Sequence, residues 1–238
     1  LVKIIAGTSG YSFKEWKGSF YPADIKPDGM LAFYATRFPT VEINNTFYRM
    51  PRENVLLDWA GQVPDGFTFA IKASQRITHH ARLKTEFSAD LLGFLLKNTA
   101  LLEDHLGPIL FQLPPNMKKD LDRLRGFLDL LPAERKFVIE FRHDSWFEDD
   151  VYDALRARDV AMCVAEQEEF KCPVVCTASW GYLRLHRFDY GEAALAEWAR
   201  RVADQPWTDA YVYFKHDEGV GSGPPAVDAF VAAVNAKA

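Results

Sequence analysis

The sequence has few cysteines and no long apolar run. Only three of its 238 residues are cysteine, Cys163, Cys172 and Cys176, and their spacing fits neither a disulfide framework nor a zinc knuckle. We expect all three to be structural thiols. No stretch approaches the ~18 consecutive apolar residues that a membrane span requires, and no cleavable signal pattern precedes the strand-like run at residues 2–6. These absences predict a soluble cytoplasmic protein with no membrane partner.

The sequence also lacks an excess of basic charge. Lysine and arginine total 28 against 33 aspartate and glutamate, which gives a net charge of −5. A mildly acidic chain is a poor candidate for wrapping duplex nucleic acid, because that affinity comes mainly from neutralised phosphates. Nucleic acid is therefore a possible but not a favoured partner. A local basic patch can still bind a small phosphate or carboxylate.

Short apolar runs alternate with amphipathic segments along the whole chain. Each run is bounded by glycine, proline or polar residues, as expected for strands buried on both faces. The predicted strands cover residues 3–8, 40–44, 67–73, 108–113, 136–141, 159–165, 180–186 and 210–215. The predicted helices cover residues 29–38, 53–60, 88–103, 118–130, 150–158, 192–203 and 225–236, and Ser88 is the expected N-cap of the third.

This alternation predicts an α/β protein with a single (β/α)₈ TIM-type barrel domain over residues 1–238. Parallel strands joined by right-handed crossovers follow from the same pattern. A doubly wound open sheet is the alternative. It is disfavoured because Gly7-Thr8-Ser9-Gly10 lacks the second half of the dinucleotide fingerprint and no phosphate-binding loop motif occurs. We therefore expect no cofactor.

Polar residues gather at the C-terminal ends of the predicted strands, where barrel active sites form. Alternate residues of a strand face the same side, so Glu42 shares a face with Asn44, Glu140 with Arg142, and Arg184 with His186. If these faces point inward, one cavity holds carboxylates, guanidiniums and an imidazole. The strand-end residues are Thr8, Ser9, Glu42, Asn44, Lys72, Gln112, Glu140, Arg142, His143, Glu166, Arg184, His186, Lys215, His216 and Asp217.

Two interpretations of this cluster stay open. Buried charges must be paired, so the cluster is either a structural ion network or a ligand site. We favour a ligand site, since apolar packing replaces a merely structural network at little cost. The carboxylates are the expected acid and base, and the arginines would stabilise negative charge. The predicted catalytic residues are Glu140, Glu42, Arg142 and His186. We expect no metal, because the neighbouring cations compete with a divalent ion.

Two loops add candidate binding residues. Residues 72–84 contain Lys72, Arg76, Arg82 and Lys84 but no acidic residue, which is typical of an anion site; a solvated basic loop is the alternative. Residues 44–49 offer amide donors and aromatic faces. The predicted substrate-binding residues are Asn44, Lys72, Arg76, His79, Gln112, Arg184, Lys215 and Tyr48.

Several motifs resemble a known family. The stretches "GTSGYSFKEWKGSFYP", "TVEINNTFYRMP", "FTFAIKASQRITHHARL", "GPILFQLPP", "VIEFRHDSW", "YLRLH" and "YVYFK" are similar to the YecE-like family, the domain of unknown function seventy-two. The resemblance covers nearly the whole chain, from Gly7 to about Gly223, and implies a TIM-type barrel without supplying a reaction. Many relatives carry Asn-Asn after the last strand, where this chain has Lys215 and His216, so a different specificity is expected there.

The favoured function is an enzyme acting on a small anionic or phosphorylated substrate at the C-terminal mouth of the barrel. A nucleic-acid-binding or repair-like barrel is an alternative, by analogy of fold with nucleases of the endonuclease IV type. A glycoside hydrolase is disfavoured, because the fourth and seventh predicted strands end in Gln112 and Arg184 rather than in carboxylates. The residues leave open whether the chain is an enzyme at all, and its oligomeric state.

Overall fold

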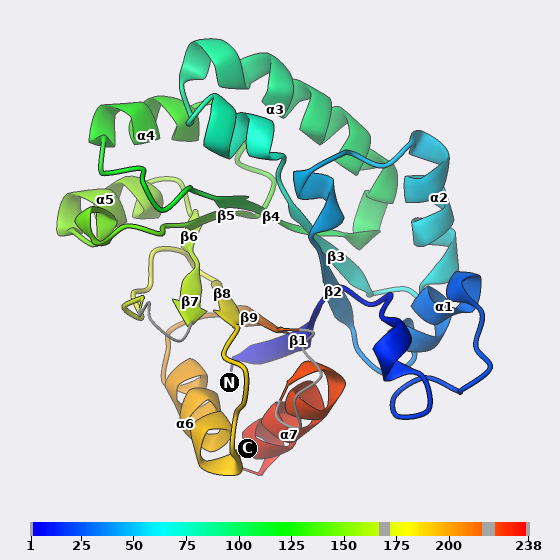
Figure 1. Cartoon of the computed structure of the whole chain (residues 1–238). Helices are drawn as coiled ribbons and strands as arrows, with labels where there is room; N and C mark the ends of the chain where they lie inside the picture. Colours follow the sequence, from blue (N-terminus) through cyan, green and yellow to red (C-terminus); the bar gives the residue numbers. More distant parts are fainter. Residues whose placement is uncertain (1, 167–171, 216–221, 237–238) are drawn as a thin grey trace.

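The computed structural model describes residues 2–166, 172–215 and 222–236. Within these ranges, nine parallel strands form a nearly closed barrel with helices around it (Figure 1). Their order in the sheet is β6-β5-β4-β3-β2-β1-β9-β8-β7. The strands are β1 (Lys3–Ser9), β2 (Thr40–Ile43), β3 (Thr68–Lys72), β4 (Leu106–Gln112), β5 (Phe137–Glu140), β6 (Ala161–Met162), β7 (Val164–Glu166), β8 (Gly181–Leu185) and β9 (Asp209–Phe214).

The barrel comes together where one predicted strand divides into two. The sequence predicts a single strand over residues 159–165, whereas the structure has β6 paired with β5 and β7 paired with β8. Only Cys163 separates β6 from β7, so one segment contacts both ends of the sheet in turn. The eight predicted runs thus account for all nine strands in the described residues, and the predicted TIM-like α/β fold is confirmed.

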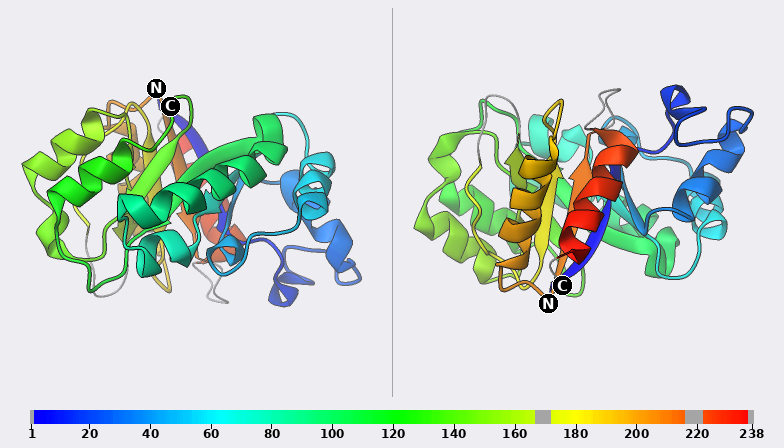
Figure 2. Two further views of the ribbon diagram at one scale, coloured as in Figure 1. Left: turned by 90° about the horizontal axis from the view of Figure 1, so that it is seen from above. Right: turned by 90° about the horizontal axis from the view of Figure 1, so that it is seen from below.

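Helices cover the outer face of the strands in every view (Figures 1 and 2). The α-helices are α1 (Met30–Ala35), α2 (Glu53–Gln62), α3 (Thr85–Thr99), α4 (Leu121–Leu128), α5 (Asp149–Arg156), α6 (Glu192–Ala203) and α7 (Gly223–Asn235). Shorter helical turns are η1 (Lys14–Trp16), η2 (Pro27–Gly29), η3 (Asn45–Phe47), η4 (Arg76–His80), η5 (Ala100–His105) and η6 (Asp144–Trp146).

The predicted N-cap of the third helix is wrong. Helix α3 begins at Thr85, so Ser88 lies inside its first turn and is buried. A capping side chain is instead present at α4, where the Asp120 carboxylate accepts a hydrogen bond from the backbone N–H of Arg123 at 3.1 Å. Helix α3 thus starts at Thr85, before the predicted start at Ser88, and Lys84 is its N-cap residue.

Two apolar layers hold the fold together. The larger lies between the sheet and the helices and includes Phe69, Phe111 and Phe127. The smaller fills the barrel interior with side chains such as Tyr182 and Tyr213. Each fully buried side chain of this size contributes about 1.5–3 kcal/mol of transfer free energy. The interior is therefore packed below the mouth, and its buried hydroxyl groups are paired, as in the hydrogen bond between Thr40 Oγ1 and Tyr213 OH at 2.7 Å.

At Gly7 the packing of the strands leaves room only for glycine. A Cβ added at Gly7 of β1 would overlap the carbonyl oxygen of Thr40 on β2.

None of the helices in the described residues is both long and apolar enough to cross a bilayer.

Candidate functional site

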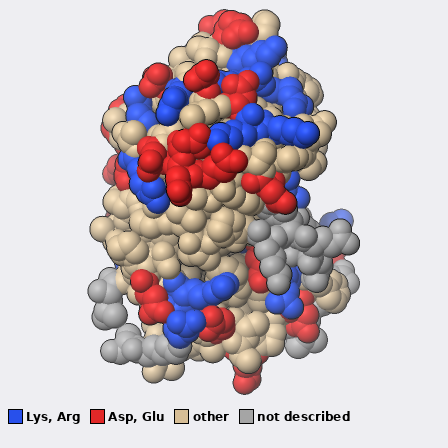
Figure 3. Space-filling view, turned by 90° about the vertical axis from the view of Figure 1, so that its left-hand side faces the viewer, with Lys and Arg blue, Asp and Glu red and all other residues tan. Residues whose placement is uncertain are grey.

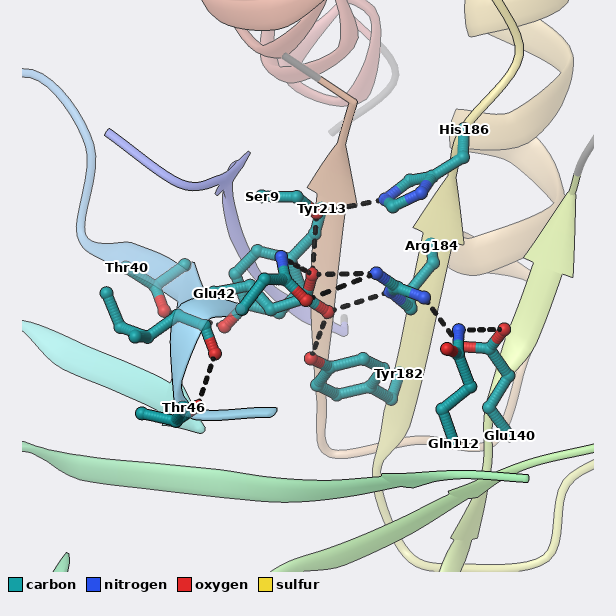
Figure 4. Close-up of polar contacts among 12 residues, drawn as sticks. Ser9, Thr40, Glu42, Thr46, Gln112, Glu140, Tyr182, Arg184, His186 and Tyr213 are labelled. Atoms are coloured by element: carbon teal, nitrogen blue, oxygen red, sulfur yellow. Dashed lines mark hydrogen bonds and ion pairs between the residues drawn. The ribbon is translucent and has the colours of Figure 1, made fainter. Parts of the chain in front are cut away.

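Arg184 of β8 is the centre of a buried ion network at the C-terminal ends of the strands (Figure 4). Its Nε donates to Glu42 Oε1 at 2.9 Å and its Nη2 to Glu42 Oε2 at 3.1 Å, which is a bidentate pairing. Its Nη1 donates to Glu140 Oε2 at 2.7 Å. Both carboxylates are fully buried. A single guanidinium thus joins β2 and β5 across the barrel.

The Glu42 carboxylate accepts further hydrogen bonds. Tyr182 OH donates to Oε1 at 2.7 Å. Ser9 Oγ and Asn44 Nδ2 donate to Oε2 at 2.7 and 2.9 Å. Burial alone would raise the pKa of Glu42, but the charge of Arg184 and the hydrogen bonds from Ser9 and Arg184 lower it to about 2. Glu42 is therefore ionised at neutral pH.

Glu140 is held in the same way from the other side. Gln112 Nε2 donates to its Oε1 at 2.8 Å, and Arg142 Nη1 donates to the same oxygen at 3.0 Å. Burial raises the pKa of this carboxyl, but Arg184 and Arg142 together outweigh burial and leave the pKa below its usual range. The pairing of Glu140 with Arg142, expected from their spacing on the strand, is present.

The network lies beside and beneath a cavity of about 540 Å³, which we call the mouth cavity. Its volume is in the range of small-molecule sites. The lining residues are Ser9, Gly10, Tyr11, Ser12, Phe13, Ile43, Asn44, Asn45, Tyr48, Trp59, Lys72, Arg184, His186 and Lys215. Glu42 and Glu140 are absent from this lining, so the cavity wall presents cations and neutral donors rather than carboxylates.

His186 is a neutral group in the wall. Burial and the charge of Arg184 lower its pKa to about 3. Its Nε2 lies 2.9 Å from Ser9 Oγ, and Ser9 uses its own proton to donate to Glu42. His186 Nε2 must then be the donor in the His186–Ser9 bond, which leaves Nδ1 as the unprotonated acceptor of the ring.

Lys72 reaches the cavity from the end of β3. Its Nζ lies 4.3 Å from the centroid of the Phe47 ring, and the His79 ring packs on Phe47 at 5.0 Å. Thr46 Oγ1 donates to the carbonyl oxygen of Lys72 at 2.7 Å and so ties the loop after β2 to β3. Burial and the charge of Arg184 lower the pKa of Lys72 to about 8. His79 is not part of the cavity lining, and its ring supports Phe47 from outside the cavity.

The structure brings together most of the residues predicted for the site. Asn44, Tyr48, Lys72, Arg184, His186 and Lys215 line the mouth cavity. Glu42, Gln112, Glu140 and Arg142 form the network around Arg184.

The basic loop reaches the mouth only through Lys72. Arg76 lines a separate cavity of about 300 Å³ that shares Tyr48 with the mouth cavity. Arg82 Nη1 donates to Asn116 Oδ1 at 3.1 Å, and Lys84 Nζ lies 6.0 Å from the centroid of the Phe87 ring. The expectation that Arg76, Arg82 or Lys84 points into the mouth therefore finds no support in the lining.

Two strand-end residues face outward instead. Thr8 Oγ1 lies 2.8 Å from Tyr34 OH of α1. Glu166 accepts from Tyr190 OH at 2.7 Å and from Trp198 Nε1 of α6 at 2.9 Å. Both have the parity that points to the helices, so they belong to the packing between sheet and helices.

The described residues do not bring together a set of side chains that could bind a metal ion. Across residues 2–166, 172–215 and 222–236, no three His, Cys, Asp or Glu groups lie close enough together to hold a metal ion. His216 and Asp217 lie outside these ranges.

Sequence reasoning missed several residues of the site. Tyr182 has a detectable signal, since it lies two residues before Arg184 and therefore shares its face of β8. Ser9 stands at a strand end but was not assigned a role. Trp59 comes from helix α2, and nothing in its local sequence indicates that it reaches the mouth.

Sequence comparisons place the chain among uncharacterised proteins. UPF0759 protein YecE of Escherichia coli K12 is 36% identical over 115 residues, which cover 48% of this chain and 42% of YecE. UPF0759 protein YunF of Bacillus subtilis is 28% identical over 156 residues, covering 63% of this chain and 54% of YunF. The matched part of the chain thus spans about half the length of these curated relatives.

Solved structures agree with the barrel. A DUF72 family protein from Thermotoga maritima has a TM-score of 0.73 at 23% identity, with 99% of this chain and 98% of that chain covered. One from Enterococcus faecalis has a TM-score of 0.81 at 16% identity, with 98% and 95% covered. At these identities the likeness shows the fold alone. The family model described as "Protein of unknown function DUF72" matches residues 5–238, and the chain therefore belongs to the DUF72 family.

Proposed function

We propose that the mouth cavity binds a small anionic or phosphorylated substrate and that the protein is an enzyme acting on it. The observation that carries this proposal is the charge balance around the cavity. Among the described residues, the lining of the cavity includes three basic side chains, Lys72, Arg184 and Lys215, and no carboxylate.

The basic side chains of the wall attract an anion in the cavity. Two opposite charges 4 Å apart attract by about 4 kcal/mol at an effective dielectric constant near 20. The wall adds a neutral donor to this attraction, the second N–H of the Asn44 amide. An anion bound in the cavity would therefore lie against the basic side chains of its wall, Lys72, Arg184 and Lys215.

In this proposal the carboxylates have a positioning role. Glu42 and Glu140 lie outside the cavity lining, and each oxygen of both carboxylates accepts at least one hydrogen bond, so neither faces a substrate as acid or base. Their function is to fix the guanidinium of Arg184 at the wall. The aromatic residues Tyr11, Tyr48 and Trp59 also line the cavity and suit an apolar part of the substrate.

The face of the molecule that carries α4 and α5 does not support the nucleic-acid alternative. There, acidic and basic side chains are interspersed (Figure 3). Lys119, for example, pairs with Glu148 and with Asp150 at 2.5 and 2.7 Å. A polyanion needs a continuous basic surface, and the described residues of this face do not form one.

Calorimetric titration with sulfate and phosphate tests the proposal. The parent protein is compared with Lys215→Met, which removes a cation of the cavity wall, and with Lys97→Met, which removes an exposed lysine of α3. Loss of a charged hydrogen-bond partner costs about 1.5–3 kcal/mol, so the affinity of Lys215→Met falls by about 10- to 150-fold while Lys97→Met is unchanged. Equal affinities in all three proteins would refute an anion site at the mouth.

A second titration separates the two classes of ligand. A single-stranded oligonucleotide is titrated at several salt concentrations, because contact with many phosphates gives a steep dependence of affinity on salt. Tight, strongly salt-dependent binding of the oligonucleotide, together with no binding of sulfate or phosphate, would favour the nucleic-acid alternative.

A further inference from the structure

Lys72 has an unusual environment for a lysine. Both carboxylates near it are taken up by Arg184, and within the part of the chain that the structure describes no hydrogen bond or ion pair joins Lys72 Nζ to another side chain. Its contact is the face of the Phe47 ring, which fixes the position of Nζ through a cation–π interaction. Lys72 is half-buried and lines the mouth cavity, so the amine is both held and accessible to a ligand.

Burial favours the neutral amine of Lys72. Burial has the largest effect and Arg184 follows, with a smaller contribution from Arg142; Glu140 and Glu42 oppose them, and the net result is a pKa of about 8. About a tenth of the amine is then unprotonated at pH 7, roughly 300 times the fraction expected at the ordinary value. Desolvation beside another cationic group is a known way of activating a lysine as a nucleophile.

We propose that Lys72 is a catalytic nucleophile that forms a Schiff base with the carbonyl group of a small anionic aldehyde or ketone. This inference rests on the proposed function, because the negative group of the substrate would be held by Lys215 and Arg184 while its carbonyl carbon faces Nζ. It names the chemical class of substrate: a carbonyl compound that also carries a carboxylate or a phosphate.

The step balances without any other reactant. The lone pair of Nζ attacks the carbonyl carbon, and a proton moves from the nitrogen to the carbonyl oxygen to give a carbinolamine. The C–O bond then breaks, the hydroxyl group leaves as water with the second nitrogen proton, and a C=N bond remains. No atom is oxidised or reduced. His186, whose Nδ1 is an acceptor, and Ser9 line the same cavity and are the groups placed to relay these protons.

Reductive trapping on the intact protein tests the inference. The folded parent is incubated with pyruvate and sodium cyanoborohydride, which reduces an imine to a stable secondary amine, and the modified lysines are located by peptide mass spectrometry. Acetone, a ketone without the carboxylate, is the matched probe. Lys72→Met is tested alongside, with Lys97→Met as the control. Because the modified site is read directly in the parent, the result does not depend on whether Lys72→Met folds.

The expected result is that Lys72 is modified by pyruvate at least tenfold faster than Lys97. Saturating sulfate suppresses this modification, and acetone reacts much more slowly. Modification of Lys72 no faster than that of Lys97 overturns the nucleophile, even where sulfate binding shows that the anion site exists. Equal reaction with pyruvate and acetone overturns the anionic substrate class and, with it, the anion site, while leaving Lys72 reactive. The two failures are therefore distinguishable.

Discussion

Replacing Glu42 with glutamine tests how the mouth of the barrel is held together. The substitution keeps the shape of the side chain but replaces one carboxylate oxygen with an NH₂ group. At Oε1 that group would face the N–H of Arg184 Nε and the hydroxyl of Tyr182; at Oε2 it would face Ser9, Asn44 and Arg184 Nη2. Either orientation therefore sets donor against donor and removes one of the two counterions of the buried Arg184 guanidinium.

Two arguments give a similar magnitude for the loss of folding stability in Glu42→Gln. Breaking a buried ion pair by removing one partner costs about 3–5 kcal/mol. A pKa lowered from 4.5 to about 2 corresponds to stabilisation by the ionised form of about 3 kcal/mol. For a chain of this length each kcal/mol lowers the melting temperature by about 2–4 °C. We therefore expect Glu42→Gln to melt about 6–20 °C below the parent at pH 7.

The pH dependence of the stability follows from the direction in which the pKa of Glu42 is shifted. The pKa of Glu42 is lower in the folded than in the unfolded protein, so its stabilisation is complete above about pH 4.5 and is lost as the pH falls through about 2. The gap between the melting temperatures of parent and variant should narrow over that window.

The assay is a thermal melt followed by circular dichroism, with Glu197→Gln as the matched control. Glu197 also pairs with an arginine, Arg200, but both side chains are about half exposed, and exposed pairs add little. The control should melt within error of the parent. If Glu42→Gln does so as well, the carboxylate is not a structural counterion of Arg184 and our reasoning about the network fails.

Three further predictions concern other parts of the molecule. Gly7→Ala should unfold well below the parent in a urea titration, because its Cβ overlaps the carbonyl oxygen of Thr40; an unchanged midpoint would mean that β1 and β2 lie farther apart than described. Ser88→Ala should be neutral or slightly stabilising in the same assay, since the buried Ser88 Oγ has no hydrogen-bond partner among the described residues. A loss of about 1 kcal/mol of stability would instead indicate that Ser88 caps the helix. Sulfate affinity should fall as the pH rises through about 8, because Lys72 loses its positive charge there, and titrations of Lys72→Met should show a flatter profile; identical profiles would remove Lys72 from the anion site.

The faces of the strands were predictable because they depend on local geometry. Alternation along a strand is enough to turn Glu42, Glu140 and Arg184 to the same side as their neighbours two residues away. The division of the sixth predicted strand at Cys163 was not predictable from its continuous apolar pattern, since it arises only when the segment must pair with β5 and then with β8.

The roles of the polar residues depend on distances between strands, which local patterns do not contain. That Arg184 takes up both carboxylates, and so leaves Lys72 without one, follows from the closure of the barrel. Arg76 belongs to η4, which carries it to a different cavity from Lys72 although the two are only four residues apart. A cytoplasmic location and a single domain over the whole chain stay predictions of the sequence.

The most direct test of the central claim is to locate an anion in the folded protein. Crystals equilibrated with selenate would give an anomalous difference map in which the selenium position is unambiguous. The proposal predicts a peak inside the mouth cavity, within hydrogen-bond distance of Lys72 or Lys215 and beside Arg184. A well-diffracting crystal with an empty mouth, or with selenate only at exposed lysines elsewhere, would contradict it.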